Sequence, residues 1–193
     1  AVLKAHPGAT VIGEVKCTQR LFDEIEILGG KAVMCKAGHS IVKAEMKKTD
    51  ALLAGEMSGH IFFADRYYGY DDAAYAGARL LEILSNSAKN LSQMLAELPA
   101  TFSTPEIRIP CPEERKSEIV GKIIEEFSRT REVNAIDGAR IRFEHGWGLV
   151  RPSNTQALLI LRFEANSEEN LQTIRQQIEN RVKSLIGSLT RKL

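Results

Sequence analysis

The 193-residue sequence has little of several features that mark special classes of protein. Its three cysteines, Cys17, Cys35 and Cys111, stand far apart with no C-x-x-C pair, so neither a disulfide framework nor a zinc site is indicated and reduced thiols are expected. The chain also lacks an excess of one charge: it has 26 Lys and Arg residues and 25 Asp and Glu residues, which gives a net charge of +1. This balance argues against binding to nucleic acid or a membrane surface through a broad positive field. Any anionic ligand must therefore be held by a small group of neighbouring donors.

Long hydrophobic runs are missing as well. No stretch approaches the roughly 18 apolar residues of a membrane-spanning helix, and no charged-then-apolar leader precedes the first predicted strand. With 44% hydrophobic residues, the chain can still form one or two cores. We therefore expect a soluble, cytoplasmic globular protein. It begins at Ala1 in helix-like sequence, which suggests a fragment of a longer polypeptide.

Residues 1–100 alternate predicted strands and helices. Apolar runs at 10–15, 31–36 and 51–54 predict strands, and segments with apolar residues at helical spacing separate them. Alternation of this kind predicts a mixed, mostly parallel sheet with helices on both faces, an α/β/α arrangement. In such sheets, ligands bind at the carboxyl ends of the strands.

A polar residue follows each of these three strands. Lys16 follows the first, His39 the second and Glu56 the third. Since the carboxyl ends of neighbouring parallel strands meet at one edge of a sheet, we expect the three side chains to converge on one crevice. Each residue also has an ordinary interpretation: Lys16 as a solvated lysine, His39 as a helix cap and Glu56 as a solvent-facing turn residue.

The segment Gly55 to His60 (GEMSGH) is a polar turn between two apolar strands. Its two glycines permit positive φ or a close approach to a ligand, while Glu56, Ser58 and His60 supply a carboxylate, a hydroxyl and an imidazole. A turn alone requires only one or two of these residues. We therefore predict that this turn binds a ligand.

The composition changes between residues 99 and 112, where several prolines lie among Thr and Ser. We place a domain boundary there, dividing 1–100 from 101–193. The second part is predicted to contain an edge strand, a helix, three antiparallel strands and a closing helix, with Asp137-Gly138 as a tight hairpin turn. This order predicts a smaller α+β domain with a four-stranded antiparallel sheet and two helices.

The segment Arg151 to Thr155 (RPSNT) lies between the last two predicted strands. It combines an arginine, two hydroxyls, an amide and turn N–H groups, with no carboxylate. One arginine guanidinium can bind two phosphate oxygens at once, and the backbone N–H groups of a turn provide fixed hydrogen-bond donors. The segment therefore predicts a phosphate cradle, although solvated turns of this composition are common.

Three segments together carry a family resemblance. KAGHS (36–40), GEMSGH (55–60) and RPSNT (151–155), in this order and at these separations, resemble the later landmarks of the α-D-phosphohexomutases, in the phosphomannomutase/phosphoglucomutase branch. The resemblance covers essentially the whole chain. It implies a four-domain plan in which the first domain carries a phosphoserine, the second binds Mg²⁺, the third reads the sugar and the fourth holds phosphate. By this resemblance the chain is domains three and four, with domains one and two as partners in the same polypeptide.

The resemblance also implies an activity, the interconversion of glucose or mannose 1-phosphate and 6-phosphate through a phosphoserine enzyme and a 1,6-bisphosphate. Glu56 and Ser58 match residues that hydrogen-bond the 3- and 4-hydroxyls of the sugar, so both sugars are admitted because they differ only at carbon two. The substrate loop implied in the first domain is Glu56, Met57, Ser58, Gly59 and His60. The residues implied to line the reacting end are His39, Lys16 and His60. For His39, acid–base catalysis or substrate orientation fits titration near neutral pH.

The phosphate loop implied in the second domain is Arg151, Pro152, Ser153, Asn154 and Thr155. It matches the clamp on the phosphate that is not being transferred. Relatives often have Ala where this chain has Pro152, which stiffens the loop and is expected to change little.

The chain departs from the family pattern in what it lacks. It contains neither a Ser-His-Asn phosphoserine loop nor a DGDGDR-type metal loop, and Asp71-Asp72 is more simply a helix amino terminus. Phosphoryl transfer needs in-line positioning and a cation. The resemblance thus implies Mg²⁺ bound outside this chain, no metal within it, weak phosphosugar binding and no turnover by the chain alone.

Three alternatives stay open. A phosphoglucosamine mutase fragment is the nearest, but its relatives have Gln in place of Met57, which argues against it. A non-catalytic phosphosugar-binding or regulatory module is the second. A structural interaction domain, the third, predicts no phosphosugar binding.

Overall fold

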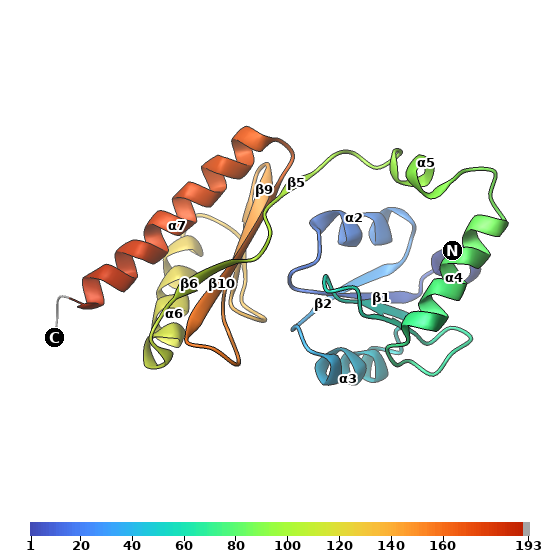
Figure 1. Cartoon of the computed structure of the whole chain (residues 1–193), viewed down its shortest axis with the longest axis horizontal. Coiled ribbons are helices and arrows are strands. Elements are labelled where there is room, and N and C mark those ends of the chain that lie inside the picture. Colours follow the sequence, from blue (N-terminus) through green and yellow to red (C-terminus); the bar gives the residue numbers. More distant parts are fainter. Residues whose placement is uncertain (191–193) are drawn as a thin grey trace. The chain divides into compact units, whose positions relative to one another are not determined.

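A computed structural model describes residues 1–190, and the chain divides into two compact units, Ala1–Pro99 and Ala100–Leu193 (Figure 1). The elements of the first unit are α1 (Val2–Ala5), β1 (Thr10–Glu14), α2 (Gln19–Ile27), β2 (Lys31–Cys35), α3 (His39–Thr49), β3 (Leu53–Gly55), β4 (Ile61–Phe63), α4 (Ala73–Ser85) and α5 (Leu91–Leu95).

The first unit is built on a four-stranded sheet in the order β2-β1-β3-β4. Strand β1 pairs in parallel with β2 and β3, and β4 returns antiparallel to β3. Helices α2 and α3 cover opposite sides of this sheet (Figure 1). Four of the five residues of β1 are buried, because a central strand covered on both faces is screened from water on each side. The predicted mostly parallel sheet with helices on both faces is confirmed.

Apolar packing fixes these helices on the sheet. Between α3 and the sheet lies a core of Ile12, Cys35, Val42, Met46, Ala51, Ala54 and Phe62. On the α2 side, Gly13 allows close approach, since a Cβ there would lie 2.8 Å from Cζ of Phe22. Thr18 caps α2 by accepting the N–H of Arg20 at 3.3 Å. Apolar residues at helical spacing therefore face the sheet, and a capping side chain marks where α2 begins.

The second unit is an antiparallel sheet with helices. Its elements are β5 (Phe102–Ser103), β6 (Ile107–Pro110), the 3₁₀ helix η1 (Glu113–Arg115), α6 (Lys116–Phe127), β7 (Val133–Asn134), β8 (Ala139–Phe143), β9 (Gly146–Pro152), β10 (Leu158–Ala165) and α7 (Glu168–Thr190). The strand order is β5-β10-β9-β8-β7, and β6 also pairs with β10. Helices α6 and α7 pack on each other and on the central strands, so the α+β prediction is confirmed.

Two details of the second unit differ from the prediction. The sheet has six strands rather than four; the two-residue strand β5 was not predicted, whereas β7 is the strand on the amino side of the predicted hairpin turn. A strand as short as β5 carries no sequence pattern of its own. Strand β7 also ends at Asn134, so the connection to β8 is longer than the tight turn predicted at Asp137-Gly138.

The core of the second unit lies between the sheet and both helices. It includes Ile119, Ile123, Ile141, Leu159, Leu161, Phe163, Ile174, Ile178 and Val182. The predicted apolar face of α7 is therefore the buried one. Trp147 is 2% exposed and donates its indole N–H to Glu164 at 3.1 Å.

Two further observations concern thiols and membrane insertion. Cys17, Cys35 and Cys111 are all buried free thiols, and burial raises the pKa of Cys35 to about 12, which keeps it protonated. Within residues 1–190, every helix is too short or too polar to cross a lipid bilayer.

Candidate functional site

The GEMSGH segment forms a closed turn between β3 and β4. The N–H of Glu56 donates to the carbonyl of His60 at 2.9 Å, and the N–H of Gly59 donates to the carbonyl of Glu56 at 3.0 Å. Gly59 has φ of +91°, a conformation that favours glycine. Glu56 and Met57 are half-buried, whereas Ser58, Gly59 and His60 are exposed. The turn is therefore fixed by its backbone and presents polar side chains to solvent.

Glu56 reaches the amino end of helix α3. Its Oε1 accepts the N–H of Gly38, the N-cap residue of α3, at 2.9 Å. A carboxylate is stabilised there by the unpaired N–H groups and the positive end of the helix dipole. Because His39 is the first residue of the same helix, this contact brings together residues that follow β2 and β3.

The side chains of His39, Glu56 and His60 form one cluster. Each offers a ligand atom, and these atoms all lie within 4.8 Å of one another. The two imidazole rings meet edge to face with centroids 4.5 Å apart. Two of the three residues predicted to converge, His39 and Glu56, therefore do so, and His60 joins them.

Asp71 links the two histidines, a role that its sequence position did not suggest. Its Oδ2 lies 2.8 Å from Nδ1 of His60 and 3.2 Å from Nε2 of His39. Its Oδ1 accepts the N–H of Ile61 at 3.3 Å. The interpretation of Asp71 as a helix-opening residue is wrong, because Asp72 is the N-cap of α4 and accepts the N–H of Tyr75.

These contacts determine which imidazole nitrogens carry protons. An ionised carboxylate only accepts hydrogen bonds, so each nitrogen that faces Asp71 is assigned an N–H. In the neutral rings, this leaves Nε2 of His60 and Nδ1 of His39 as the proton acceptors. The cluster can thus exchange protons with a bound hydroxyl.

Lys16 is connected to the turn through Glu14, a residue that sequence reasoning missed. Glu14 is 0% exposed; its Oε2 accepts the N–H of Lys16 at 2.8 Å and its Oε1 accepts the N–H of Met57 at 3.1 Å. Burial raises the pKa of Glu14, while the two N–H donors act in the opposite direction. One carboxylate therefore ties the end of β1 to the GEMSGH turn. A charged residue inside the apolar run TVIGEV was the available signal.

The RPSNT segment of the second unit does not offer five equivalent groups. Arg151 is buried, and its Nη2 lies 3.1 Å from Oδ2 of Asp137. Ser153 is buried too, and its Oγ accepts the N–H groups of Gln156 at 3.2 Å and Thr155 at 3.4 Å. Pro152 is half-buried, while Asn154 and Thr155 are exposed.

A second missed residue, Lys116, lies behind this segment. Its Nζ donates to the carbonyl of Ser153 at 2.5 Å and to the carbonyl of Gln156 at 3.0 Å. It also pairs with Glu113 at 2.7 Å. Lys116 begins α6 in a run of charged residues, so nothing in its sequence surroundings indicates that it is buried.

The histidine cluster is the only group of metal-ligating side chains found in the part of the chain that the structure describes. Mg²⁺ prefers six oxygen ligands in octahedral geometry, whereas His39, Glu56 and His60 offer two nitrogens and one carboxylate. The donor set does not fit Mg²⁺.

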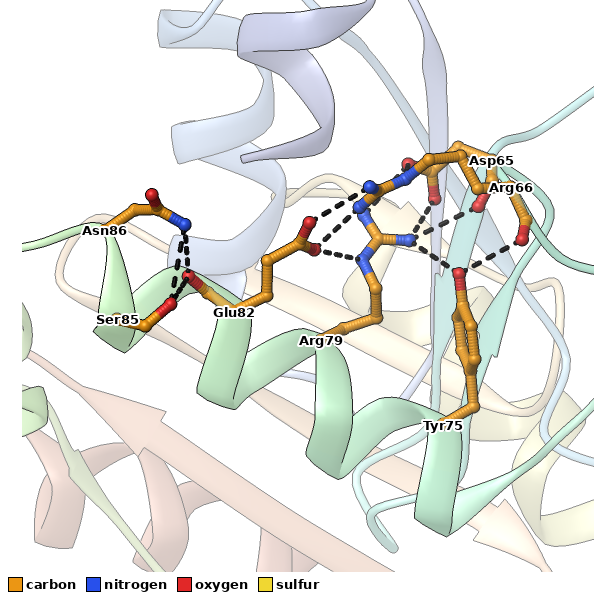
Figure 2. Close-up of polar contacts among 7 residues, drawn as sticks. All are labelled: Asp65, Arg66, Tyr75, Arg79, Glu82, Ser85 and Asn86. Carbon is orange, nitrogen blue, oxygen red and sulfur yellow. Dashed lines mark hydrogen bonds and ion pairs between the residues drawn. The ribbon is translucent and has the colours of Figure 1, made fainter.

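A separate buried ion-pair network lies in the first unit, beside a pocket of about 550 Å³ that Ala1, Arg66, Ile83 and Met94 help to line. Figure 2 shows Arg79 pointing at Asp65, to which it donates two hydrogen bonds of 2.9 Å. Asp65 follows β4, so this pair fixes α4 against the sheet. An arginine held by a buried carboxylate in this way is a structural element, and the histidine cluster stays the stronger candidate site.

Comparison with known proteins finds a family model for each of the two units. Residues 1–102 match the family model "Phosphoglucomutase/phosphomannomutase, alpha/beta/alpha domain III", and residues 106–181 match "Phosphoglucomutase/phosphomannomutase, C-terminal domain".

Three similar proteins illustrate the match. A phosphomannomutase/phosphoglucomutase of Pseudomonas aeruginosa is 46% identical over 190 residues, which are 97% of this chain and 41% of that protein. A phosphoglucomutase of Neisseria gonorrhoeae is 48% identical over 192 residues, covering 97% of this chain and 40% of that protein. A crystal structure of a phosphoglucomutase/phosphomannomutase family protein from Burkholderia thailandensis superposes with a TM-score of 0.83 at 42% identity, covering 95% of this chain and 39% of that one.

The chain thus spans about two fifths of the length of these relatives, and it matches the two family domains in their expected order. The sequence resemblance, the two sheets and the family models all agree. The chain belongs to the phosphoglucomutase/phosphomannomutase family and comprises its domain III and its C-terminal domain.

Proposed function

We propose that this chain provides the sugar and phosphate recognition of a phosphomannomutase/phosphoglucomutase. The whole enzyme would interconvert hexose 1-phosphate and 6-phosphate through a phosphoserine and a 1,6-bisphosphate. The two remaining domains of the same polypeptide would carry the phosphoserine and bind Mg²⁺. Family membership and the unsuitability of the histidine cluster for Mg²⁺ support this division.

In the first unit, the GEMSGH turn is proposed to read the sugar. The carboxylate of Glu56 accepts hydrogen bonds from the 3- and 4-hydroxyls, and the hydroxyl of Ser58 can donate to them or accept from them. Met57 and Gly59 shape the turn. Glucose and mannose share these hydroxyls, so the turn admits both. The fixed backbone of the turn supports this role, because a reader of hydroxyl positions must itself be held in place.

His39, His60 and Lys16 are proposed to line the reacting end of the sugar. The accepting Nε2 of His60 can take the proton of the hydroxyl that receives the phosphoryl group, with Asp71 holding the ring. Lys16 adds a positive charge that suits a phosphate. The convergence of His39, Glu56 and His60 is the observation that carries the proposal.

In the second unit, the RPSNT loop is proposed to hold the phosphate that is not being transferred. Arg151 supplies charge, while Ser153, Asn154 and Thr155 supply hydrogen-bond donors and Pro152 stiffens the turn. Without the phosphoserine and Mg²⁺, this chain binds phosphosugar weakly and turns over none.

Isothermal titration of the chain with glucose 1-phosphate and mannose 1-phosphate tests the proposal. We expect weak binding of both, and a loss of roughly tenfold in affinity for Glu56→Gln, because one charged hydrogen-bond partner is removed. Glu26→Gln, at an exposed position on α2, is the matched control and should bind as wild type does.

Two results would contradict the proposal. Absence of binding by the wild-type chain would favour a structural interaction domain. Tighter binding of glucosamine 1-phosphate than of either hexose phosphate would favour a phosphoglucosamine mutase.

A further inference from the structure

Lys116 is a buried lysine whose ammonium group is fully engaged. Its side chain is 4% exposed, and a buried ammonium is unfavourable unless it is paired and hydrogen-bonded. Its three N–H donors match three acceptors: the carboxylate of Glu113 and the carbonyls of Ser153 and Gln156. Two of these acceptors lie in the backbone of the RPSNT loop and its next residue. The lysine therefore holds this loop from the inside.

The bond to the carbonyl of Ser153 also fixes the direction of the next amide. The peptide bond between Ser153 and Asn154 is trans, so its C=O and N–H groups point in opposite directions. Because the carbonyl points toward Lys116, the N–H of Asn154 points away from it. Asn154 is exposed, so this N–H is directed toward the solvent side of the loop.

The other amides of the turn are already used. The N–H groups of Thr155 and Gln156 both donate to Oγ of Ser153. Within the described residues, the N–H of Asn154 has no protein acceptor. A turn N–H fixed outward, with a positive charge behind it, is a donor suited to an anion.

We propose that Lys116 is a positioning residue that aims the N–H of Asn154 at a bound phosphate and adds its own charge behind the loop. This inference rests on the proposed phosphate-binding role of RPSNT and extends it to a residue 35 positions before Arg151 in the sequence. A purely structural Lys116 would stabilise the loop without affecting how the folded protein binds phosphate.

Amide NMR spectra of the whole chain during titration with inorganic phosphate separate these roles. In the wild-type chain, the Asn154 amide signal should move more than those of Thr155 and Gln156, because its N–H gains the anion as acceptor. In Lys116→Met, phosphate affinity should fall roughly tenfold, since a charge and the loop geometry are lost together. Lys122→Met is the control: Lys122 lies on the same helix and pairs with Glu118 at 2.7 Å on the surface.

The outcomes are distinguishable. A folded Lys116→Met chain with wild-type phosphate affinity would overturn this inference and leave the proposed function intact. A wild-type chain in which phosphate moves Thr155 or Gln156 but not Asn154 would overturn it even if Lys116→Met failed to fold. No phosphate-dependent change at residues 151–156 would overturn the phosphate role of the loop itself.

Discussion

The two candidate loops are held from behind by buried ionisable side chains of opposite kind, an acid behind one and a base behind the other. Behind the GEMSGH turn of the first unit, the carboxylate of Glu14 accepts a backbone N–H from Met57. Behind the RPSNT loop of the second unit, the ammonium of Lys116 donates to two backbone carbonyls. In the first loop the backbone group that points to the buried side chain is an N–H, and in the second loop such groups are carbonyls.

This difference matches the ligands proposed for the two loops. In the first loop an inward N–H is consumed by Glu14, so recognition depends on side chains such as Glu56 and Ser58, which suits hydroxyl groups. In the second loop the inward groups are carbonyls, which leaves a backbone N–H for an anion. A residue behind a loop can therefore select what the loop binds without touching the ligand.

Removing the buried acid behind the first loop should have the largest effect. Glu14→Leu leaves the N–H groups of Lys16 and Met57 without their buried acceptor, and we expect a loss of about 3 kcal/mol in the free energy of unfolding. Urea denaturation followed through amide signals of residues 1–99 measures it. Glu26→Leu, at an exposed position, should change the value by less than about 0.5 kcal/mol.

The difference in the free energy of unfolding between wild type and Glu14→Leu should also depend on pH. Because burial raises the pKa of Glu14, the folded chain binds this proton more tightly than the unfolded chain does. The stability that the neutral carboxyl contributes is complete below the ordinary pKa of Glu and is lost as pH rises through the raised folded-state pKa. The difference between wild type and Glu14→Leu should therefore be greater at about pH 4 than at about pH 8. The opposite trend would show that Glu14 acts as a buried anion throughout.

In the second loop, removing a charge should strengthen binding. Asp137 faces Arg151 at 3.1 Å, and its carboxylate both competes with phosphate for the guanidinium and repels the anion. Asp137→Asn keeps a hydrogen-bond acceptor but removes the charge, so phosphate should bind roughly fivefold more tightly in the NMR titration. Asp23→Asn, at an exposed position of the first unit, is the control. Weaker binding would mean that Asp137 chiefly orients the arginine.

The sequence predicted those features of the fold that depend on local patterns. Alternating apolar runs indicated the parallel sheet, and the order of strands and helices in residues 101–193 indicated the antiparallel sheet with its closing helix. These features follow from residue spacing. The two-residue strand β5 forms only by pairing with the distant strand β10, so no local pattern indicates it.

The residues behind the loops could not be predicted in the same way. Glu14 binds a residue 43 positions away, and Lys116 binds residues 37 and 40 positions away. Such partners are set by tertiary contacts. The sequence did identify the loops themselves, because GEMSGH and RPSNT are dense in polar groups. The functional roles of their residues stay predictions.

Asp71 shows how two adjacent identical residues can have different roles. Only Asp72 has the geometry to cap α4, so Asp71 is free of that role and instead bridges His39 and His60. Asp71→Asn can present either an oxygen or an NH₂ group to the rings, which removes the preference for N–H at Nδ1 of His60. We expect a mixture of His60 tautomers in ¹⁵N spectra and about threefold weaker binding of glucose 1-phosphate, the smallest effect of the series.

Asp50→Asn is the matched control, because Asp50 is an exposed residue that ends α3, the helix that His39 begins. It should leave the His60 ring signals unchanged. If Asp71→Asn also left them unchanged, the carboxylate would not set the tautomer. Recognition in the first unit would then depend on Ser58 and on Glu56, which its bond to the N–H of Gly38 holds in place, and not on the protonation pattern of the histidines.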